Sequence, residues 1–365
     1  MYKTQFIVSV RCFTFNQSKY IEETLDGFVM QKTSFPFICI IMDDDSQDGE
    51  PEVIKHYLEH HFNLADDSVV RNEETDDYIM TFAQHKENKN CYFAVYYLKY
   101  NHYKKKAKEP YFSCWEKDVK YIALCEGDDC WIDAKKLQKQ VDYMEQHIEC
   151  SLTHTAFEYM DEDVLQKNSI QDINKKNLSL LESECDLRPY ILDGNQYLIQ
   201  TMTVLFRRED FMLYKSFIKD YEGKFLMGDT QLWVYLLSKG SLFYFSDITS
   251  IYRLHQNSAT HQSSIEAKLR FSLSCTEMRV YMSEKCNLSS QYITKFVNQY
   301  KWTLIEYLWY NKDYQPVINV TFTWYEELIL MISKQSFVRS LGRLIYESKI
   351  KDCIANFLRN MSPFK

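Results

Sequence analysis

Short apolar runs alternate with helical stripes along the first half of the chain. In residues 21–29 the apolar side chains recur at i, i+4, i+7 and i+8, the spacing of an amphipathic helix. The apolar runs between such stripes are four to ten residues long, which favours buried strands. The predicted strands are Phe6–Val10, Phe37–Met42, Cys91–Tyr100 and Tyr121–Leu124, and the predicted helices cover residues 21–29, 53–58 and 137–148.

The second half continues less regularly. Residues 65–90 and 160–190 are polar and poorly patterned, so we expect loops there. Further strands are predicted at 201–207, 242–245 and 249–252, with a helix after Asp229 that Gly240 ends. Beyond residue 262 the pattern is helical throughout. We therefore expect two domains, residues 1–260 and a helical C-terminal region, 261–365.

Strands that alternate with helices predict an α/β fold with a mostly parallel sheet flanked by helices. Two of the predicted strands end in acidic clusters, Asp43–Asp45 and Asp128–Asp129. Ligands of open α/β sheets bind beyond the carboxyl ends of the strands. We therefore expect the two acidic clusters to converge on one crevice.

Composition and charge narrow the class of protein. The 365 residues carry a net charge of -8, so we expect no nucleic-acid partner. The sequence shows no apolar run of about 18 residues and no charged start with a cleavage site, so neither a spanning helix nor a signal peptide is expected. The 11 cysteines are irregularly spaced in a long chain, which favours reduced thiols and a cytoplasmic location.

The C-terminal tail differs from the rest of the chain. Residues 334–365 carry seven Lys or Arg against two acidic residues, and their apolar side chains, among them Phe337, Leu341 and Leu344, fall at helical spacing. A basic amphipathic helix can bind peripherally to an anionic membrane face. The alternative is an apolar stripe that packs on the catalytic domain or in a dimer, which is the commoner use of such a stripe.

Four short motifs contain residues suited to chemistry, and each also has an ordinary structural reading. The pair Asp128–Asp129 suits Mg²⁺ or Mn²⁺ together with substrate phosphates, or forms a solvated acidic turn. The Asp43–Asp45 cluster can bind a nucleobase or ribose, or forms a turn that caps a helix. Asp229 is by default a helix cap. In Tyr252–His255 the Arg and His side chains can face phosphates.

The order of these motifs resembles that of the family 2 glycosyltransferases. The opening residues 8–25 are similar to the family's first strand and helix, and Met42–Gly49 is similar to its Val-Asp-Asp-Gly-Ser-Thr-Asp-Gly. Glu126–Trp131 resembles its metal motif, and Gly228-Asp229 and Tyr252–His255 follow in the expected order. The resemblance covers residues 6–256. Phe13, Asp45 and Ala134 depart from the usual Pro, Gly and Pro, which affects positioning of the nucleotide and removes no carboxylate.

The resemblance implies a GT-A fold and inverting, metal-dependent transfer of a sugar from a nucleotide donor, commonly UDP, to a glycan or lipid-linked acceptor hydroxyl. The resemblance also implies Mn²⁺ or Mg²⁺ as the cofactor. It further implies a role in polysaccharide biosynthesis. The roles carried over from the family motifs are metal ligands (Asp129, His255), donor contacts (Asp44 at the base, Asp128 near the ribose, Arg253 and Trp131) and the catalytic base (Asp229).

Two other functions remain open on the sequence. A sugar-phosphate nucleotidyltransferase also pairs acidic residues with Mg²⁺, but it normally carries a Gly-rich phosphate loop near the N-terminus, which this sequence lacks. A catalytically silent nucleotide-binding protein is the second alternative, and the retained carboxylates argue against it.

Overall fold

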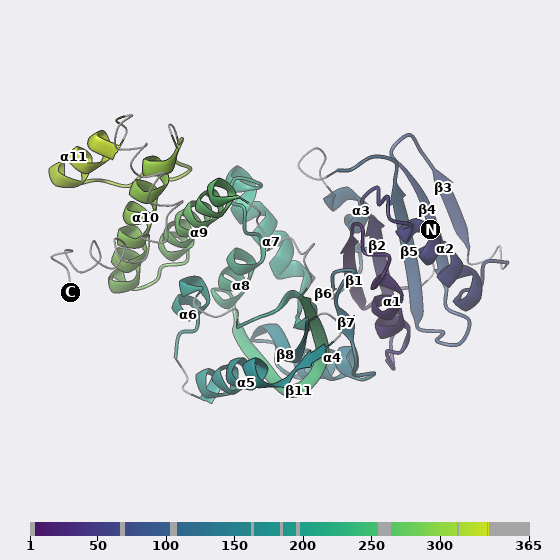
Figure 1. The fold of residues 1–365 in the computed structure, drawn as a ribbon. Helices are drawn as coiled ribbons and strands as arrows, with labels where there is room; N and C mark the ends of the chain where they lie inside the picture. The colour runs from purple at the N-terminus through teal and green to yellow at the C-terminus, as the bar shows by residue number, and fades with distance from the viewer. Residues whose placement is uncertain are drawn as a thin grey trace. The chain divides into compact units, whose positions relative to one another are not determined.

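A computed structural model describes residues 4–65, 70–102, 108–161, 164–182, 185–194, 198–254, 264–311, 314–333 and 335, and it places the apolar runs in a central β-sheet. Within these residues the strands form one sheet of 11 strands in the order β3-β4-β5-β2-β1-β6-β10-β8-β11-β7, with β9 added to β8 (Figure 1). The strands are β1 (Val8–Thr14), β2 (Phe37–Asp43), β3 (Arg71–Glu74), β4 (Tyr78–Gln84), β5 (Cys91–Leu98), β6 (Tyr121–Leu124), β7 (Cys130–Trp131), β8 (Cys150–Asp161), β9 (Val164–Gln166), β10 (Leu205–Arg207) and β11 (Ser241–Leu254).

The centre of the sheet is parallel. Strands β5, β2, β1 and β6 run in one direction, and the register pairs Thr14 with Asp43 at the carboxyl ends of β1 and β2. Antiparallel strands extend both sides, with β3 and β4 next to β5 and β10 between β6 and β8. The predicted α/β class with a helix-flanked sheet is therefore confirmed, and its sheet is mixed.

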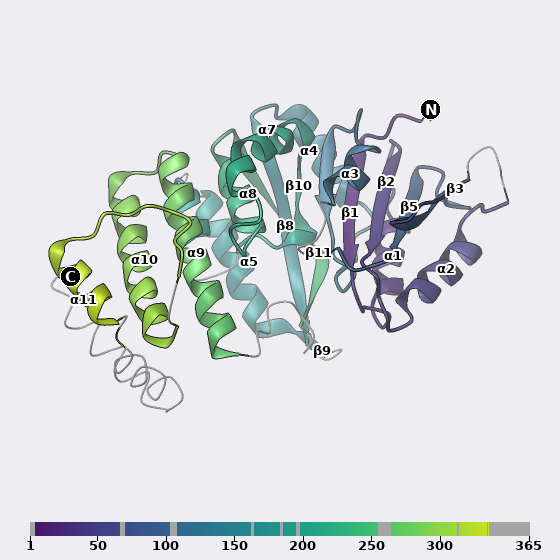
Figure 2. The same cartoon turned by 90° about the horizontal axis from the view of Figure 1, so that it is seen from above.

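Helices cover the sheet on both faces (Figure 2). Apolar side chains of α1, α2 and α4 join one core cluster, and Tyr111 and Phe112 of α3 join the cluster on the other face. The α-helices are α1 (Ile21–Val29), α2 (Glu50–His61), α3 (Glu109–Ser113), α4 (Lys136–Gln146), α5 (Lys167–Glu182), α6 (Arg188–Asp193), α7 (Arg208–Ile218), α8 (Asp229–Leu237), α9 (Ile265–Lys285), α10 (Ser290–Tyr310) and α11 (Trp324–Ser333), and the 3₁₀ turns are η1 (Thr201–Thr203) and η2 (Lys219–Tyr221).

Strand β2 shows why its sequence is apolar without interruption. Phe37, Cys39 and Ile41 belong to the core cluster on one face, whereas Ile38 and Ile40 belong to the cluster on the other. A strand in the middle of a parallel sheet is covered on both faces, so the usual alternation of apolar and polar residues disappears.

Both segments that the sequence predicted as loops contain regular structure. Residues 65–90 include the hairpin of β3 and β4, and residues 160–190 include β9 and α5, while β8 extends to Asp161. Strand β3 is exposed along its whole length, so it has no apolar signal to detect. The predicted strands 242–245 and 249–252 are one strand, β11, whose register against β8 shifts between Phe245 and Ser250.

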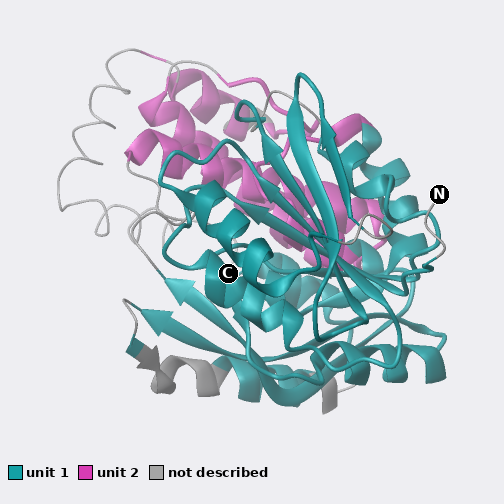
Figure 3. Ribbon diagram, turned by 90° about the vertical axis from the view of Figure 1, so that its right-hand side faces the viewer, with its two compact units in different colours: residues 1–219, 235–255 teal, residues 220–234, 256–365 magenta. Residues whose placement is uncertain are grey.

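The chain divides into two compact units, coloured separately in Figure 3. The first unit, which contains the sheet, comprises Met1–Lys219 and Tyr235–His255. The second comprises Asp220–Val234 and Gln256–Lys365. The short segment Asp220–Val234, which precedes the last part of the first unit in the sequence, thus belongs with the C-terminal helices. The predicted boundary at residue 260 stays a prediction.

The second unit is helical in its described part. Its longest elements are α9 and α10, which contact each other, and α11 contacts α10 (Figure 1). The fully buried carboxylate of Glu277 in α9 accepts hydrogen bonds from the Tyr314 hydroxyl and from the Val317 N–H, the latter at 2.8 Å. This carboxylate ties the segment after α10 back to α9. Apart from Gln335, the predicted basic helix of residues 334–365 lies outside the described residues. Among the described residues no helix has both the length and the apolar character needed to span a bilayer.

Candidate functional site

The carboxyl ends of β1, β2 and β6 meet at one edge of the sheet, where the two acidic loops begin. The Asp44 N–H donates to the Thr14 carbonyl at 3.1 Å, and the Gly127 N–H donates to the Phe13 carbonyl at 3.0 Å. Both loops are therefore tied to the end of β1. A methyl group at Gly127 would lie 2.6 Å from Thr14 Cβ, so the close approach of this loop requires glycine.

Three carboxylates gather in the second loop. One oxygen each of Glu126, Asp128 and Asp129 lies within 4.8 Å of the others. Glu126 is exposed, Asp128 is half-buried and Asp129 is buried. Burial, together with the neighbouring charges of Asp128 and Glu126, raises the pKa of Asp129 well above its ordinary value. Like-charged groups in this arrangement favour a bound cation, which would offset their repulsion.

The two oxygens of Asp129 differ. Its Oδ1 accepts a hydrogen bond from the Arg253 backbone N–H at 3.0 Å. Its Oδ2 is buried and has no hydrogen-bond partner among the described residues. A buried oxygen without a partner is costly, so its persistence needs an explanation such as an unseen ion. The donor set of carboxylate oxygens fits Mg²⁺ or Mn²⁺, which prefer oxygen ligands.

Asp44 is held by its own chain. Its Oδ1 accepts the His102 N–H at 2.7 Å, and its Oδ2 accepts from Lys108 Nζ at 2.6 Å. The side chain is nearly fully buried. Asp44 therefore anchors the segment that follows β5, and its role as a reader of the nucleobase stays a prediction. The neighbouring Asp43 is also buried, which raises its pKa to about 7.

A buried glutamate links the loop that follows β1 to the loop that follows β2. Glu50, the first residue of α2, accepts hydrogen bonds from the Thr14 hydroxyl, from the Gln17 N–H at 2.9 Å and from the Ser46 hydroxyl at 2.8 Å. Burial raises the pKa of this carboxyl. Glu50 was not among the candidate residues of the sequence analysis, because a glutamate in the first turn of a helix is an ordinary feature.

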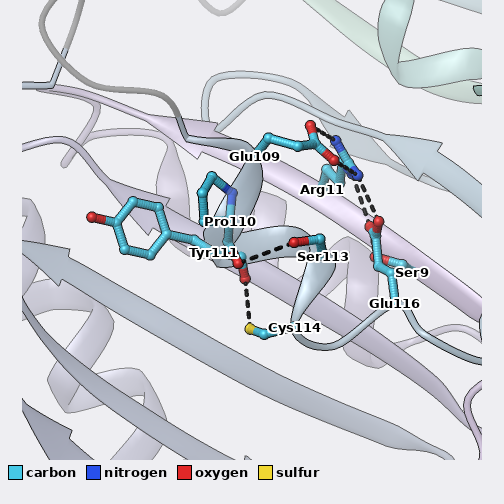
Figure 4. A network of polar contacts seen from close by, with 8 residues as sticks. All are labelled: Ser9, Arg11, Glu109, Pro110, Tyr111, Ser113, Cys114 and Glu116. Atoms are coloured by element: carbon cyan, nitrogen blue, oxygen red, sulfur yellow. Dashed lines mark hydrogen bonds and ion pairs between the residues drawn. The ribbon is translucent and has the colours of Figure 1, made fainter. Parts of the chain in front are cut away.

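An ion-pair network fixes α3 against β1 on the other face of the sheet (Figure 4). The Arg11 guanidinium donates to Glu116 at 2.8 and 2.5 Å and to Glu109 at 3.0 and 2.9 Å. The Ser9 hydroxyl also donates to Glu116 at 2.8 Å. Because Arg11 and Glu116 are buried, removing one partner would leave an uncompensated charge in the core. The network thus fixes the position of α3, which begins at the residue after Lys108, the partner of Asp44.

Trp131 is part of the core. Its side chain is 2% exposed, its Nε1 donates to the Met202 carbonyl at 2.8 Å, and its ring centre lies 5.0 Å from that of Phe28. Lys136 Nζ, also buried, lies 4.5 Å from the ring centre of Trp131. The structure thus places the ring inside the protein. The predicted contact between Trp131 and a donor stays a prediction.

The remaining candidate residues lie in different parts of the chain. Arg253, on β11, is buried beside Asp128 and Asp129. Asp229 begins α8 in the second unit, where its Oδ1 accepts the Thr230 N–H at 2.7 Å and burial raises its pKa. Asp229 thus accepts a hydrogen bond within the first turn of α8, and both its capping role and its role as a base stay predictions. His255 lies outside the described residues.

Helix α1 contacts the acidic loop, a role that the sequence did not predict. The buried Thr24 hydroxyl lies 2.6 Å from the Asp129 carbonyl and 2.9 Å from the Gly127 carbonyl, and it can donate its single proton to either. A methyl group at Gly27 would lie 2.8 Å from the Trp131 backbone. These contacts join segments that lie about 100 residues apart in the sequence. No local sequence pattern could therefore have predicted them.

Comparisons with known proteins agree with the resemblance seen in the sequence. Residues 9–74 match the model of the family described as glycosyl transferase family 2. Uncharacterized proteins of Mycobacterium bovis and of two Mycobacterium tuberculosis strains are 26% identical over 256 residues, which is 70% of this chain and 61% of theirs. The chain thus spans about three-fifths of the length of the curated relatives it matches.

The fold is shared with a solved structure. Residues 1–349 of Staphylococcus aureus TarS, in complex with UDP-GlcNAc, align with a TM-score of 0.50 and 12% identity over 82% of this chain and 80% of that one. A mannosyltransferase from Pyrobaculum calidifontis, in complex with GDP-Man and Mn²⁺, aligns with a TM-score of 0.45 and 10% identity over 100% of this chain and 89% of that one. The predicted resemblance to the family 2 glycosyltransferases and the predicted GT-A fold are confirmed.

Proposed function

We propose that this chain, whose residues 9–74 carry the family 2 glycosyltransferase pattern, transfers a sugar from a nucleoside diphosphate donor to an acceptor hydroxyl. The observation that carries the proposal is the group of three carboxylates at the carboxyl edge of the sheet, with the buried Oδ2 of Asp129 unpartnered among the described residues. This is the edge at which open α/β sheets bind their ligands.

Asp129, Asp128 and Glu126 are the residues that would hold a divalent cation. When bound, Mn²⁺ or Mg²⁺ supplies Lewis-acid stabilisation of the negative charge that develops on the diphosphate leaving group. Because Asp129 is buried and its Oδ1 is fixed by the Arg253 N–H, its Oδ2 needs no reorientation to serve as a ligand.

The donor is proposed to be UDP-linked, as the family pattern commonly has it and as UDP-GlcNAc is in the TarS structure. Asp44 is proposed to contact the base, and Asp128 to lie near the ribose, which are the roles that the family pattern implies. The acceptor is proposed to be a glycan or a lipid-linked hydroxyl. An acceptor hydroxyl is a weak nucleophile, so a carboxylate must take its proton as it attacks, and Asp229 is the residue we assign to this step. Attack from the face opposite the leaving group inverts the anomeric carbon.

The test of the function is incubation of the protein with a panel of UDP-sugars and Mn²⁺, with separate assays for UDP and for pyrophosphate. We expect UDP release, slow with water alone and faster with the correct acceptor. Pyrophosphate release would instead indicate a sugar-phosphate nucleotidyltransferase. A donor that stabilises the protein against heat without any turnover over a wide acceptor panel would indicate a nucleotide-binding protein without activity.

Asp44→Ala should weaken the binding of free UDP by about tenfold, the loss of one charge-assisted contact. Titration of UDP by calorimetry measures this change. Lys108→Met is the companion variant, because it removes the partner of Asp44 and keeps the carboxylate. An equal loss in Lys108→Met would show that Asp44 acts by anchoring its neighbouring segment. An unchanged affinity in Asp44→Ala would contradict any role at the base.

A further inference from the structure

The guanidinium of Arg253 is enclosed by its own chain. The side chain is buried, its Nη1 donates to the Asp128 carbonyl at 2.9 Å, and its Nη2 forms an ion pair with the Glu23 carboxylate. Its terminal carbon lies 5.1 Å from the centre of the Tyr20 ring. A side chain placed to receive a phosphate would present its fork of donors to the site, whereas two of the donor groups of Arg253 are already directed at protein oxygens.

The backbone of the same residue acts on the next carboxylate. The Arg253 N–H donates to Asp129 Oδ1, so one residue of β11 holds two consecutive residues of the acidic loop by different atoms. These contacts cross from β11 to the start of β7, next to the antiparallel pairing of Ile251 with Cys130. The side-chain contact fixes the backbone of Asp128, and the backbone contact fixes the carboxylate of Asp129.

Helix α1 supplies the other end of the ion pair. Glu23 is 63% exposed, whereas Arg253 is 3% exposed at its side chain, so the pair joins the surface of α1 to a buried residue of β11. One residue further along, the Thr24 hydroxyl meets the Asp129 carbonyl. Thr24 therefore contacts the acidic loop directly from the α1 side, whereas Glu23 acts on it through Arg253, which contacts it from the β11 side.

We propose that Glu23 and Arg253 form a positioning pair that orients Asp128 and Asp129 for a divalent cation, and that Arg253 is not a ligand of the donor phosphates. The inference rests on the proposed function, since it needs the carboxylates to bind a cation. Side chains that orient metal ligands commonly contribute 10- to 100-fold to metal affinity. The fork geometry matters, because a lysine ammonium is a single point charge and an arginine presents separate donors to separate acceptors.

The experiment measures Mn²⁺ affinity directly, without nucleotide or acceptor, by titrating the full chain and following free Mn²⁺ by electron paramagnetic resonance. The variants are Arg253→Lys, which keeps the charge and loses the fork, and Glu23→Gln, which keeps the shape and loses the ion pair. Glu22→Gln is the matched control, because Glu22 is exposed in the same turn of α1 and its removal changes the net charge equally. UDP affinity in the presence of a chelator is measured on the same proteins.

We expect Arg253→Lys and Glu23→Gln each to weaken Mn²⁺ binding by about 10- to 100-fold, with metal-free UDP affinity unchanged and Glu22→Gln like the wild type. The double variant should lose little more than Arg253→Lys alone, since both changes break one pair. Should Arg253→Lys fail to fold, Glu23→Gln carries the test, because its side chain is mostly exposed.

Wild-type Mn²⁺ affinity in Glu23→Gln would overturn the positioning pair. So would a loss of metal-free UDP affinity in Arg253→Lys that Glu23→Gln does not share, because it would make Arg253 a donor ligand. A wild-type protein that binds no Mn²⁺ would overturn the metal-dependent function itself, and the pair with it. The Mn²⁺ titration of the wild type thus distinguishes failure of the positioning pair from failure of the proposed metal-dependent function.

Discussion

Asp129→Asn should lower metal-dependent turnover by about a thousandfold, the equivalent of roughly 4 kcal/mol in the barrier. The change is nearly isosteric. An asparagine can still accept the Arg253 N–H through its amide oxygen, but a nitrogen then replaces the unpartnered Oδ2. That nitrogen carries two protons and cannot bind a cation. Steady-state kinetics at several Mn²⁺ concentrations, with Mn²⁺ titration of the resting protein, measure the effect.

The same variant should be no less stable than the wild type in the absence of metal. Burial and the neighbouring carboxylates raise the pKa of Asp129, which means that the ionised form is disfavoured in the fold. Removing that charge removes the cost, so the melting temperature should stay equal or rise. Asp142→Asn, an exposed change on α4, is the control for loss of one negative charge. Wild-type turnover and Mn²⁺ affinity in Asp129→Asn would show that the metal assignment is wrong.

Asp229→Asn should lower turnover by about 10²–10⁴-fold while UDP affinity is nearly kept, because a general base acts in the transition state. The amide oxygen of asparagine can still accept the Thr230 N–H, so the start of α8 keeps its hydrogen bond. Because burial raises the pKa of Asp229, the acidic limb of the wild-type pH–rate profile should lie above the range of an ordinary aspartate. The limb falls toward low pH, since the base must be deprotonated.

Asp220→Asn is the matched control for Asp229→Asn, because Asp220 is exposed and belongs to the same segment of the second unit. A loss of UDP affinity equal to the loss of turnover would make Asp229 a donor ligand. Unchanged turnover would leave Asp229 with its capping role alone.

The parallel centre of the sheet and the acidic loops could be predicted because their signals are local. Strand β2 is buried on both faces and reads as an unbroken apolar run that stops at Asp43. The hairpin of β3 and β4 could not be predicted in the same way, since β3 is entirely exposed and has no apolar pattern. Strand β4 joins the sheet by antiparallel pairing with β5, and β3 joins it only by pairing with β4.

The candidate site shows the same division. The carboxylates of Asp128 and Asp129 were found because acidic residues after a strand are visible in the sequence. Their supports were not, because Thr24 lies 105 residues before Asp129 in the sequence and Glu23 lies 230 residues before its partner Arg253. The predicted donor contact of Arg253 rested on residue type and order, and residue type alone does not show that a guanidinium is already engaged by its own chain.

The interleaving of the two units bears on the order in which the chain can fold as it is synthesised. The sheet of the first unit lacks β11 until residue 254 has left the ribosome, because β11 pairs with both β8 and β7. Residues 220–234 are synthesised before the rest of the second unit, with which they pack. The Leu226 N–H donates to Ser274 Oγ at 2.9 Å, and the Tyr221 and Phe225 rings contact Tyr281. A chain that ends near residue 260 would therefore lack the packing partners of the segment that carries Asp229. Any shortened form for study must keep α9.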